Sequence, residues 1–340
     1  AKGNYSNVLI TNYGDVILGR GIVTPLDKYT FGAVVGGNYK TEETAGTIGI
    51  HKVIIESGKY NDIIAGSSLE TNTPNNKYIT HEITIGTMKE SAVNRNDKVT
   101  ITGYLAMGEA EDKCYPFNSE GLQSANSGYG LYYSKTNIYS ATFTGENKYS
   151  EDAENTSIYL RTINGFTDGK TEFNIYCGDV NGNVYAGSRE AKTKASDSTG
   201  QADVNMLNFY GGHINGDIFG HGNTTSTGNS ILTFEGCFGI TGNIFGGSKT
   251  TKEGSAKVTG NTNIRINSSI IIDGNIYGGS SGVITKSIVN ENTGAIVGDT
   301  NITLNAGTVK GDIFGGGYDC GATGSSNITI KNGQVIGNTY

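Results

Sequence analysis

Few residues in this sequence have the spacing that a metal site requires. The four histidines are His51, His81, His213 and His221. Only His213 and His221 fall within one repeat of the chain, and neither has the cysteine or acidic cluster beside it that a zinc site would need. We therefore expect no metal site.

Catalytic groups are equally scarce. The glycine-rich blocks are not followed by the Gly-Lys-Ser/Thr that opens a helix in a phosphate-binding loop. Acidic residues gather in one stretch: Glu109, Glu111, Asp112, Glu151, Asp152 and Glu154. Paired carboxylates can cleave a polysaccharide, but no basic cluster recurs in any repeat position. We interpret the stretch as a solvated acidic loop and expect no catalytic residue and no cofactor.

The chain is organised instead by one glycine block that it repeats. The copies are Gly182-Asn183-Val184-Tyr185-Ala186-Gly187, Gly216-Asp217-Ile218-Phe219-Gly220, Gly242-Asn243-Ile244-Phe245-Gly246-Gly247, Gly274-Asn275-Ile276-Tyr277-Gly278-Gly279, Gly311-Asp312-Ile313-Phe314-Gly315-Gly316 and the partial Gly337-Asn338-Thr339-Tyr340. Their first glycines are 26 to 37 residues apart. A period of about 20–50 residues indicates a solenoid, a propeller or an array.

The constant part of each repeat favours a solenoid, because it is too short for a four-stranded propeller blade. In 301–305, Ile302 and Leu304 alternate with polar residues, as in a strand with one buried face. A turn at Ala306-Gly307 leads to a second strand that carries the glycine block. Stacked units of this kind bury their apolar faces against each other. We expect an all-β, single-stranded parallel β-helix of roughly nine to twelve coils with long loops, with each repeat glycine adopting a φ that a sharp corner requires.

The repeat is regular in one part of the chain and degenerate in another. We expect degenerate coils in 1–108, where copies such as 14–19 lack the aromatic residue. The stretch 109–170 breaks the rhythm, and we interpret it as an insertion of long-loop coils on the same body, a small lobe packed on the side being the alternative. Regular coils are expected in 171–340.

These glycine blocks resemble the right-handed parallel β-helix superfamily, and also the repeats of glycine-rich adhesin-like surface proteins of anaerobic gut bacteria. The resemblance covers most of the chain outside 109–170. It implies right-handed coiling, which the spacing alone does not show. It implies no single activity, because the same body carries lyases, hydrolases, tail spikes and adhesins.

Stacking of the repeats predicts two ladders of like residues. The aromatic ladder is Tyr185, Phe219, Phe245, Tyr277 and Phe314, followed by Tyr340 in the last copy. This ladder either points outward, as a stripe that could bind sugar rings or a partner, or points inward and stacks in the core. The absence of tryptophan argues against sugar binding by an outward stripe. The second ladder is Asn183, Asp217, Asn243, Asn275, Asp312 and Asn338. Because most of its members are neutral amides, we expect hydrogen bonding along the stack rather than Ca²⁺ binding.

Composition narrows the function classes. The net charge of −7 without a basic patch argues against nucleic-acid binding, and no apolar run approaches the 18 residues of a membrane span. Glycine is 52 of 340 residues but proline only 3, which excludes collagen, and the low charged fraction of 17% argues against disorder.

We expect an extracellular or cell-surface module, structural or adhesive and non-catalytic, within a larger bacterial surface protein, with a glycan or host surface as its candidate ligand. One alternative is a polysaccharide-active lyase or hydrolase whose site lies where 109–170 overhangs a coil. Another is a filament subunit joined end to end through open solenoid ends. The last copy stops at Tyr340 without a cap, so we expect the chain to continue or another subunit to complete the stack.

Overall fold

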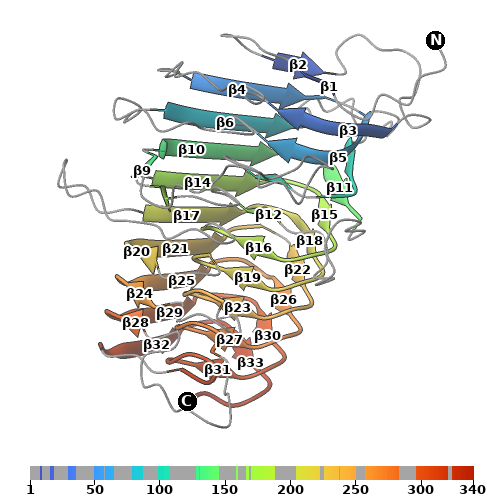
Figure 1. The fold of residues 1–340 in the computed structure, drawn as a ribbon. Helices are drawn as coiled ribbons and strands as arrows, with labels where there is room; N and C mark the ends of the chain where they lie inside the picture. Colours follow the sequence, from blue (N-terminus) through green and yellow to red (C-terminus); the bar gives the residue numbers. More distant parts are fainter. Residues whose placement is uncertain are drawn as a thin grey trace.

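A computed structural model of the chain shows parallel strands stacked coil upon coil from the N-terminal to the C-terminal end (Figure 1). The structure describes residues 8–9, 16–18, 30–35, 50–56, 58–64, 79–86, 99–103, 105–106, 128–129, 131–144, 158–159, 166–167, 170–187, 204–222, 226–236, 238–249, 257–282, 296–320 and 324–340. Within these ranges every regular element is a β-strand, and every strand pair is parallel. No helix in the described part is long and apolar enough to cross a membrane.

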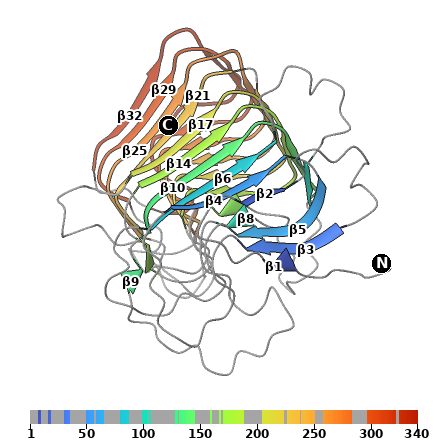
Figure 2. The same cartoon turned by 90° about the horizontal axis from the view of Figure 1, so that it is seen from above.

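One wall of the body is a ten-stranded sheet whose strands follow each other in chain order, one from each coil (Figure 2). These strands are β2 (Val16–Leu18), β4 (Ile50–Ile55), β6 (Ile79–Ile85), β10 (Leu131–Ile138), β14 (Lys170–Ile175), β17 (Val204–Phe209), β21 (Asn229–Phe234), β25 (Thr262–Ile266), β29 (Thr300–Leu304) and β32 (Ser326–Ile330). Like residues lie in register, for example Ile264 beside Ile302. We call its solvent-facing side the outer face.

The rest of each coil forms a second sheet, in which most coils contribute two short strands. Its strands are β1 (Val8–Leu9), β3 (Thr30–Val35), β5 (Gly58–Ile64), β7 (Val99–Ile101), β8 (Leu105–Ala106), β11 (Ala141–Phe143), β12 (Ile158–Tyr159), β15 (Asp179–Val180), β16 (Val184–Tyr185), β18 (Gly212–Ile214), β19 (Ile218–Phe219), β22 (Phe238–Ile240), β23 (Ile244–Phe245), β26 (Ile271–Ile272), β27 (Ile276–Tyr277), β30 (Thr308–Val309), β31 (Ile313–Phe314) and β33 (Gln334–Val335). The long β5 pairs with both β7 and β8, so one continuous strand becomes two from this coil onward.

Two small parallel sheets lie outside these walls. The first pairs β9 (Gly128–Tyr129) with β13 (Phe166–Thr167). The second contains β20 (Ser226–Thr227), β24 (Val258–Thr259) and β28 (Ile296–Val297).

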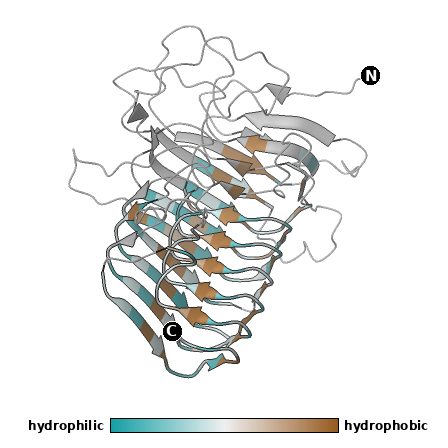
Figure 3. Ribbon diagram, turned by 60° about the horizontal axis from the view of Figure 1, so that its bottom comes forward, coloured by the Kyte–Doolittle hydropathy of each residue, from teal (hydrophilic) through white to brown (hydrophobic). Residues whose placement is uncertain are grey.

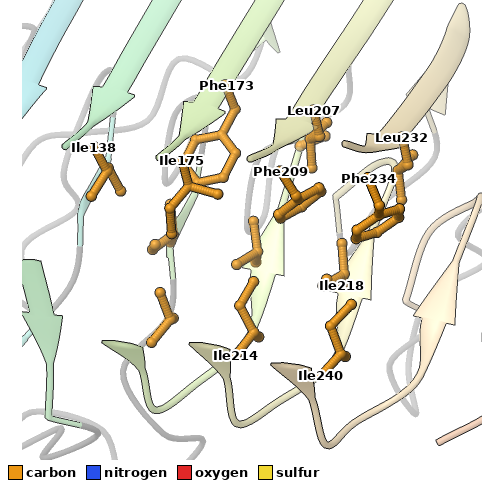
Figure 4. Close-up of a cluster of buried hydrophobic side chains, with 14 of the residues drawn as sticks. Ile138, Phe173, Ile175, Leu207, Phe209, Ile214, Ile218, Leu232, Phe234 and Ile240 are labelled. Atoms are coloured by element: carbon orange, nitrogen blue, oxygen red, sulfur yellow. The ribbon is translucent and has the colours of Figure 1, made fainter. Parts of the chain in front are cut away.

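The core fills the space between the two walls as apolar columns along the stack (Figure 3). Alternation in β17 and β21 buries Leu207, Phe209, Leu232 and Phe234, with the residues between them less buried. In Figure 4 these side chains point toward those of the opposite wall, such as Ile214. Each buried side chain of this size contributes about 1.5–3 kcal/mol, and a single coil cannot bury its own.

The predicted β-solenoid is confirmed, and the ten described strands of the first sheet fall within the predicted nine to twelve coils. Within the predicted insertion, β10 pairs with β6 and β14, so this strand belongs to the same body. The domain boundaries and the right hand stay predictions. The pocket considered where 109–170 overhangs a coil stays a prediction, because most of that stretch, including its six acidic residues, lies outside the described residues.

The predicted role of the repeat glycines is wrong. Among the described residues, positive φ does not occur at Gly182, Gly216, Gly242, Gly274, Gly311 or Gly337. A Cβ atom at Gly274 would instead lie against the carbonyl oxygen of Gly242, and 2.9 Å from Oδ1 of Asn243 in the preceding coil. Glycine is required here because successive coils approach closely. The turn glycine Gly307, with φ of 88°, does need the left-handed region.

Candidate functional site

The outer face carries a stack of tyrosines that the sequence reasoning did not single out. Tyr139, Tyr176 and Tyr210 directly follow β10, β14 and β17. The ring centroids of Tyr139 and Tyr176 are 4.9 Å apart with 14° between their planes, and those of Tyr176 and Tyr210 are 4.9 Å apart with 9°. Tyr176 and Tyr210 are 38% and 39% exposed, respectively. We call these three residues the exposed tyrosine ladder.

Strand alternation puts these rings outside. In β14, Phe173 and Ile175 point into the core, so Glu172 lies on the outer face and Tyr176 continues that row. Backbone hydrogen bonds hold the register: Tyr176 N donates to Ile138 O at 2.8 Å, and Tyr210 N donates to Ile175 O at 2.8 Å. The rings therefore stack because their backbones lie one coil apart.

A row of amides runs beside the exposed tyrosine ladder. Nδ2 of Asn174 donates to Oδ1 of Asn137 at 3.0 Å, and Nδ2 of Asn208 donates to Oδ1 of Asn174 at 2.9 Å. Nδ2 of Asn174 also donates to Oε1 of Glu172 at 3.1 Å. These hydrogen bonds orient the amides before any ligand arrives.

Charges at the N-terminal part of this patch are paired. Oε1 of Glu172 lies 3.3 Å from Nζ of Lys135, and its Oε2 lies 3.5 Å from Nζ of Lys170. Burial raises the pKa of Tyr176, and the neighbouring phenols of Tyr139 and Tyr210 raise it further. The Tyr176 hydroxyl therefore remains a hydrogen-bond donor at neutral pH.

The ladder ends on its C-terminal side at Glu235. Glu235 follows β21 and occupies the position next to Tyr210, because Phe209 and Phe234 are in register. Nδ2 of Asn267 donates to Oε1 of Glu235 at 2.7 Å, which directs the carboxylate toward the next coil. The Tyr210 ring is thus the last of the stack, followed by an exposed carboxylate instead of a fourth ring.

The aromatic ladder predicted from the glycine blocks lies inside. The rings of Tyr185, Phe219, Phe245 and Tyr277 are no more than 5% exposed, and Phe314 is half-buried. Consecutive centroids from Tyr185 to Phe314 are 4.8–4.9 Å apart with 3–5° between planes. These burials favour the inward of the two predicted orientations. Ligand binding at this buried aromatic ladder stays a prediction, one that its burial does not favour.

The predicted Asp/Asn ladder is held by hydrogen bonds along the stack, as expected. Each side-chain oxygen accepts a hydrogen bond from the backbone N–H of the ladder residue in the next coil, over 2.6–2.9 Å. The bonds join Asn183 to Asp217, Asp217 to Asn243, Asn243 to Asn275, Asn275 to Asp312 and Asp312 to Asn338. The described residues contain no group of three His, Cys, Asp or Glu side chains that could hold a metal ion.

The two histidines predicted to share a repeat are not brought together at a metal-like site. His221 is buried, and its Nδ1 lies 3.2 Å from Nδ2 of Asn205. His213 packs beneath Gly239, where a Cβ atom would lie 2.6 Å from Cδ2 of the imidazole.

A row of buried polar side chains was also missed. Asn205, Ser230, Thr262 and Thr300 donate to the carbonyl oxygens of Gly220, Gly246, Gly278 and Gly315, respectively. Each bond closes its own coil by joining a strand of the first wall to the glycine corner. A polar residue at the first or second position of these strands was the sequence signal.

A sequence signal for the exposed tyrosine ladder also exists. One pattern of amide, core residue and tyrosine recurs in Asn137-Ile138-Tyr139, Asn174-Ile175-Tyr176 and Asn208-Phe209-Tyr210.

The whole chain was compared with protein-family models, curated proteins and solved structures. None of the three comparisons found a match.

Proposed function

We propose that this chain is a rigid, non-catalytic β-solenoid module of a bacterial cell-surface protein, with a structural and adhesive role. The observation that carries the proposal is the exposed tyrosine ladder with its amide row, a flat and ordered patch on an otherwise repetitive outer face. Tyrosines held rigidly at a surface bind at a low cost in conformational entropy.

The internal ladders support the structural half of the proposal. Aromatic stacking, side-chain to backbone hydrogen bonds and strand pairing all run from coil to coil in the same direction. A body built this way resists bending, because a bend would open several rows of contacts together. A rigid rod suits a module that holds a binding surface away from a cell.

Bead retention tests the adhesive half. Fluorescent beads carrying the purified chain are passed over surfaces coated with cellulose, xylan, glucomannan, mucin or polygalacturonate, with albumin-coated beads as the control. The same polymers are incubated with soluble protein and assayed for new reducing ends and for unsaturated lyase products. We expect retention on at least one surface without depolymerisation. Retention no better than that of albumin beads contradicts adhesion, and released products favour the enzyme alternative.

A further inference from the structure

The C-terminal end of the exposed tyrosine ladder combines an aromatic platform with hydrogen-bonding groups. We propose that it is a saccharide site, in which a neutral pyranose ring stacks on Tyr210 and its hydroxyl groups bond to Glu235 and neighbouring side chains. This inference rests on the proposed adhesive function and names the ligand class and the residues. The site is separate from the buried aromatic ladder.

The platform is ordered without a ligand. The Tyr210 ring is backed by Tyr176 at 4.9 Å, and Tyr176 is backed by Tyr139 at the same distance. Because both faces of Tyr176 are covered by rings, only its edge and hydroxyl are available to solvent. Tyr210 is different, since a ring stacks on only one of its faces and the other looks toward Glu235, whose carboxylate is held by Asn267 of the following coil. A flat apolar face of this kind suits the C–H face of a sugar ring.

Polar groups surround the platform with both donors and acceptors. Thr233 lies in register with Asn208 on one side and with Arg265 on the other. Glu235 and Arg265 are exposed, and their strands place the carboxylate one coil and the guanidinium two coils beyond the strand that precedes Tyr210. Hydroxyl groups of a sugar donate and accept hydrogen bonds, and this set offers partners for both roles.

The charges on this part of the outer face nearly cancel, which favours a neutral ligand. The basic residues here are Lys135, Lys170 and Arg265, and the acidic residues are Glu172 and Glu235. Both lysines are paired with Glu172 and lie in coils that precede Tyr210, on the side away from its open face. Nucleic acid would also stack on an aromatic ring, but it needs a continuous basic groove along its backbone. An acidic sugar would place its carboxylate close to Glu235.

Calorimetric titration tests the site with defined probes: cellohexaose, xylohexaose, mannohexaose and chitohexaose as neutral chains, and hexagalacturonate as the acidic chain. We expect at least one neutral probe to bind more tightly than hexagalacturonate. Tyr210→Ala should weaken that probe about tenfold or more, because the platform is lost. Tyr210→Phe should retain most of the affinity, and Glu235→Gln should weaken it severalfold.

Tyr318→Ala is the matched control, because Tyr318 is also an exposed tyrosine, at 49%, but lies in a different part of the coil. Thermal unfolding of every variant checks that it is folded. The inference is overturned if no neutral probe binds, if hexagalacturonate binds most tightly, or if Tyr210→Ala and Tyr318→Ala behave alike. If beads that carry the Tyr210→Ala variant are retained as well as beads that carry wild type, this site is overturned but the adhesive function stands. Wild-type beads that are not retained would overturn the adhesive function itself.

Discussion

Two identical tripeptides in this chain end in tyrosines with opposite environments. Asn174-Ile175-Tyr176 ends in a residue that is 38% exposed, whereas Tyr277 of Asn275-Ile276-Tyr277 is 5% exposed. The first closes a six-residue strand, in which alternation sends the tyrosine out. The second lies on the two-residue β27 beside glycines, where both strand residues are buried. Each tyrosine joins a stack with a spacing of about one coil, so stacking alone does not decide the role of a ladder.

The comparison assigns different tasks to the two stacks. The buried aromatic ladder contributes to stability through burial and stacking, and its loss should be felt by the whole solenoid. The exposed tyrosine ladder contributes less burial and offers its ring edges and the end face of Tyr210 to solvent. Substitutions can separate the two roles.

The largest effect is expected from Phe245→Ala. Phe245 is 4% exposed and stacks between Phe219 and Tyr277, so truncation should lower the free energy of unfolding by about 3–5 kcal/mol. Denaturant unfolding followed by far-ultraviolet circular dichroism measures the change. Tyr210→Ala should cost under about 1.5 kcal/mol, because the residue is partly solvated already. Equal losses in the two variants would remove the distinction between the ladders.

Two glycines, Gly246 and Gly316, test whether close packing of successive coils holds the Phe245 ring inside. A Cβ atom at Gly246, which follows Phe245, would clash with the carbonyl oxygen of Gly278 and lie 2.7 Å from Cβ of Thr262. Gly316 has nothing within 4 Å of such an atom. We expect Gly246→Ala to cost about 1–3 kcal/mol and Gly316→Ala to be nearly neutral in thermal unfolding. Similar melting temperatures for the two variants would contradict close coil packing at the glycine corner.

The next effect concerns the bond that closes each coil. Thr262→Val preserves the shape of the side chain but removes the Oγ1 donor to Gly278 O, a buried bond next to the inner ladder. We expect a loss of about 1–2 kcal/mol in the unfolding free energy. Thr303→Val, at a half-buried position on the outer face of β29, is the control and should be nearly neutral.

The smallest effect is a pH dependence at Tyr277. Burial raises the pKa of Tyr277, so its neutral form stabilises the folded state below the ordinary tyrosine pKa of about 10, and that contribution is lost as the pH rises above it. Nδ2 of Asn275 donates to the hydroxyl at 3.1 Å. Tyr277→Phe should cost under about 1 kcal/mol at pH 7 and lose less stability than wild type between pH 9 and 11. Parallel stability curves for the two proteins would show that this phenol does not contribute.

The sequence could predict the solenoid because the glycine block recurs and Ile302 and Leu304 alternate with polar residues. It could also predict the Asn/Asp ladder, since stacked coils place like residues together. It could not decide where Tyr277 points, because a two-residue strand is too short for alternation to be read. The sequence did not distinguish the exposed tyrosine ladder, because Asn-Ile-Tyr occurs both outside the glycine block and within it.

The repeat glycines show a second limit of prediction from the sequence. The sequence identified Gly274 as a special position but suggested the wrong cause. The close approach of Gly274 to Gly242 and Asn243 depends on coil stacking, which only the three-dimensional structure shows. The saccharide site has the same character, since Tyr210 and Glu235 are 25 residues apart (235 − 210) and become neighbours only through the register of β17 and β21.

The division of roles between the two ladders is tested most directly by measuring stability and saccharide affinity together in Tyr210→Ala and Phe245→Ala. We predict that Tyr210→Ala keeps its free energy of unfolding within about 1.5 kcal/mol of wild type and loses affinity for the neutral hexasaccharide about tenfold. We predict that Phe245→Ala loses about 3–5 kcal/mol of stability and binds like wild type at temperatures where it is folded. The reverse pattern, or affinity and stability falling together in both variants, would contradict the division between an inner structural ladder and an outer recognition ladder.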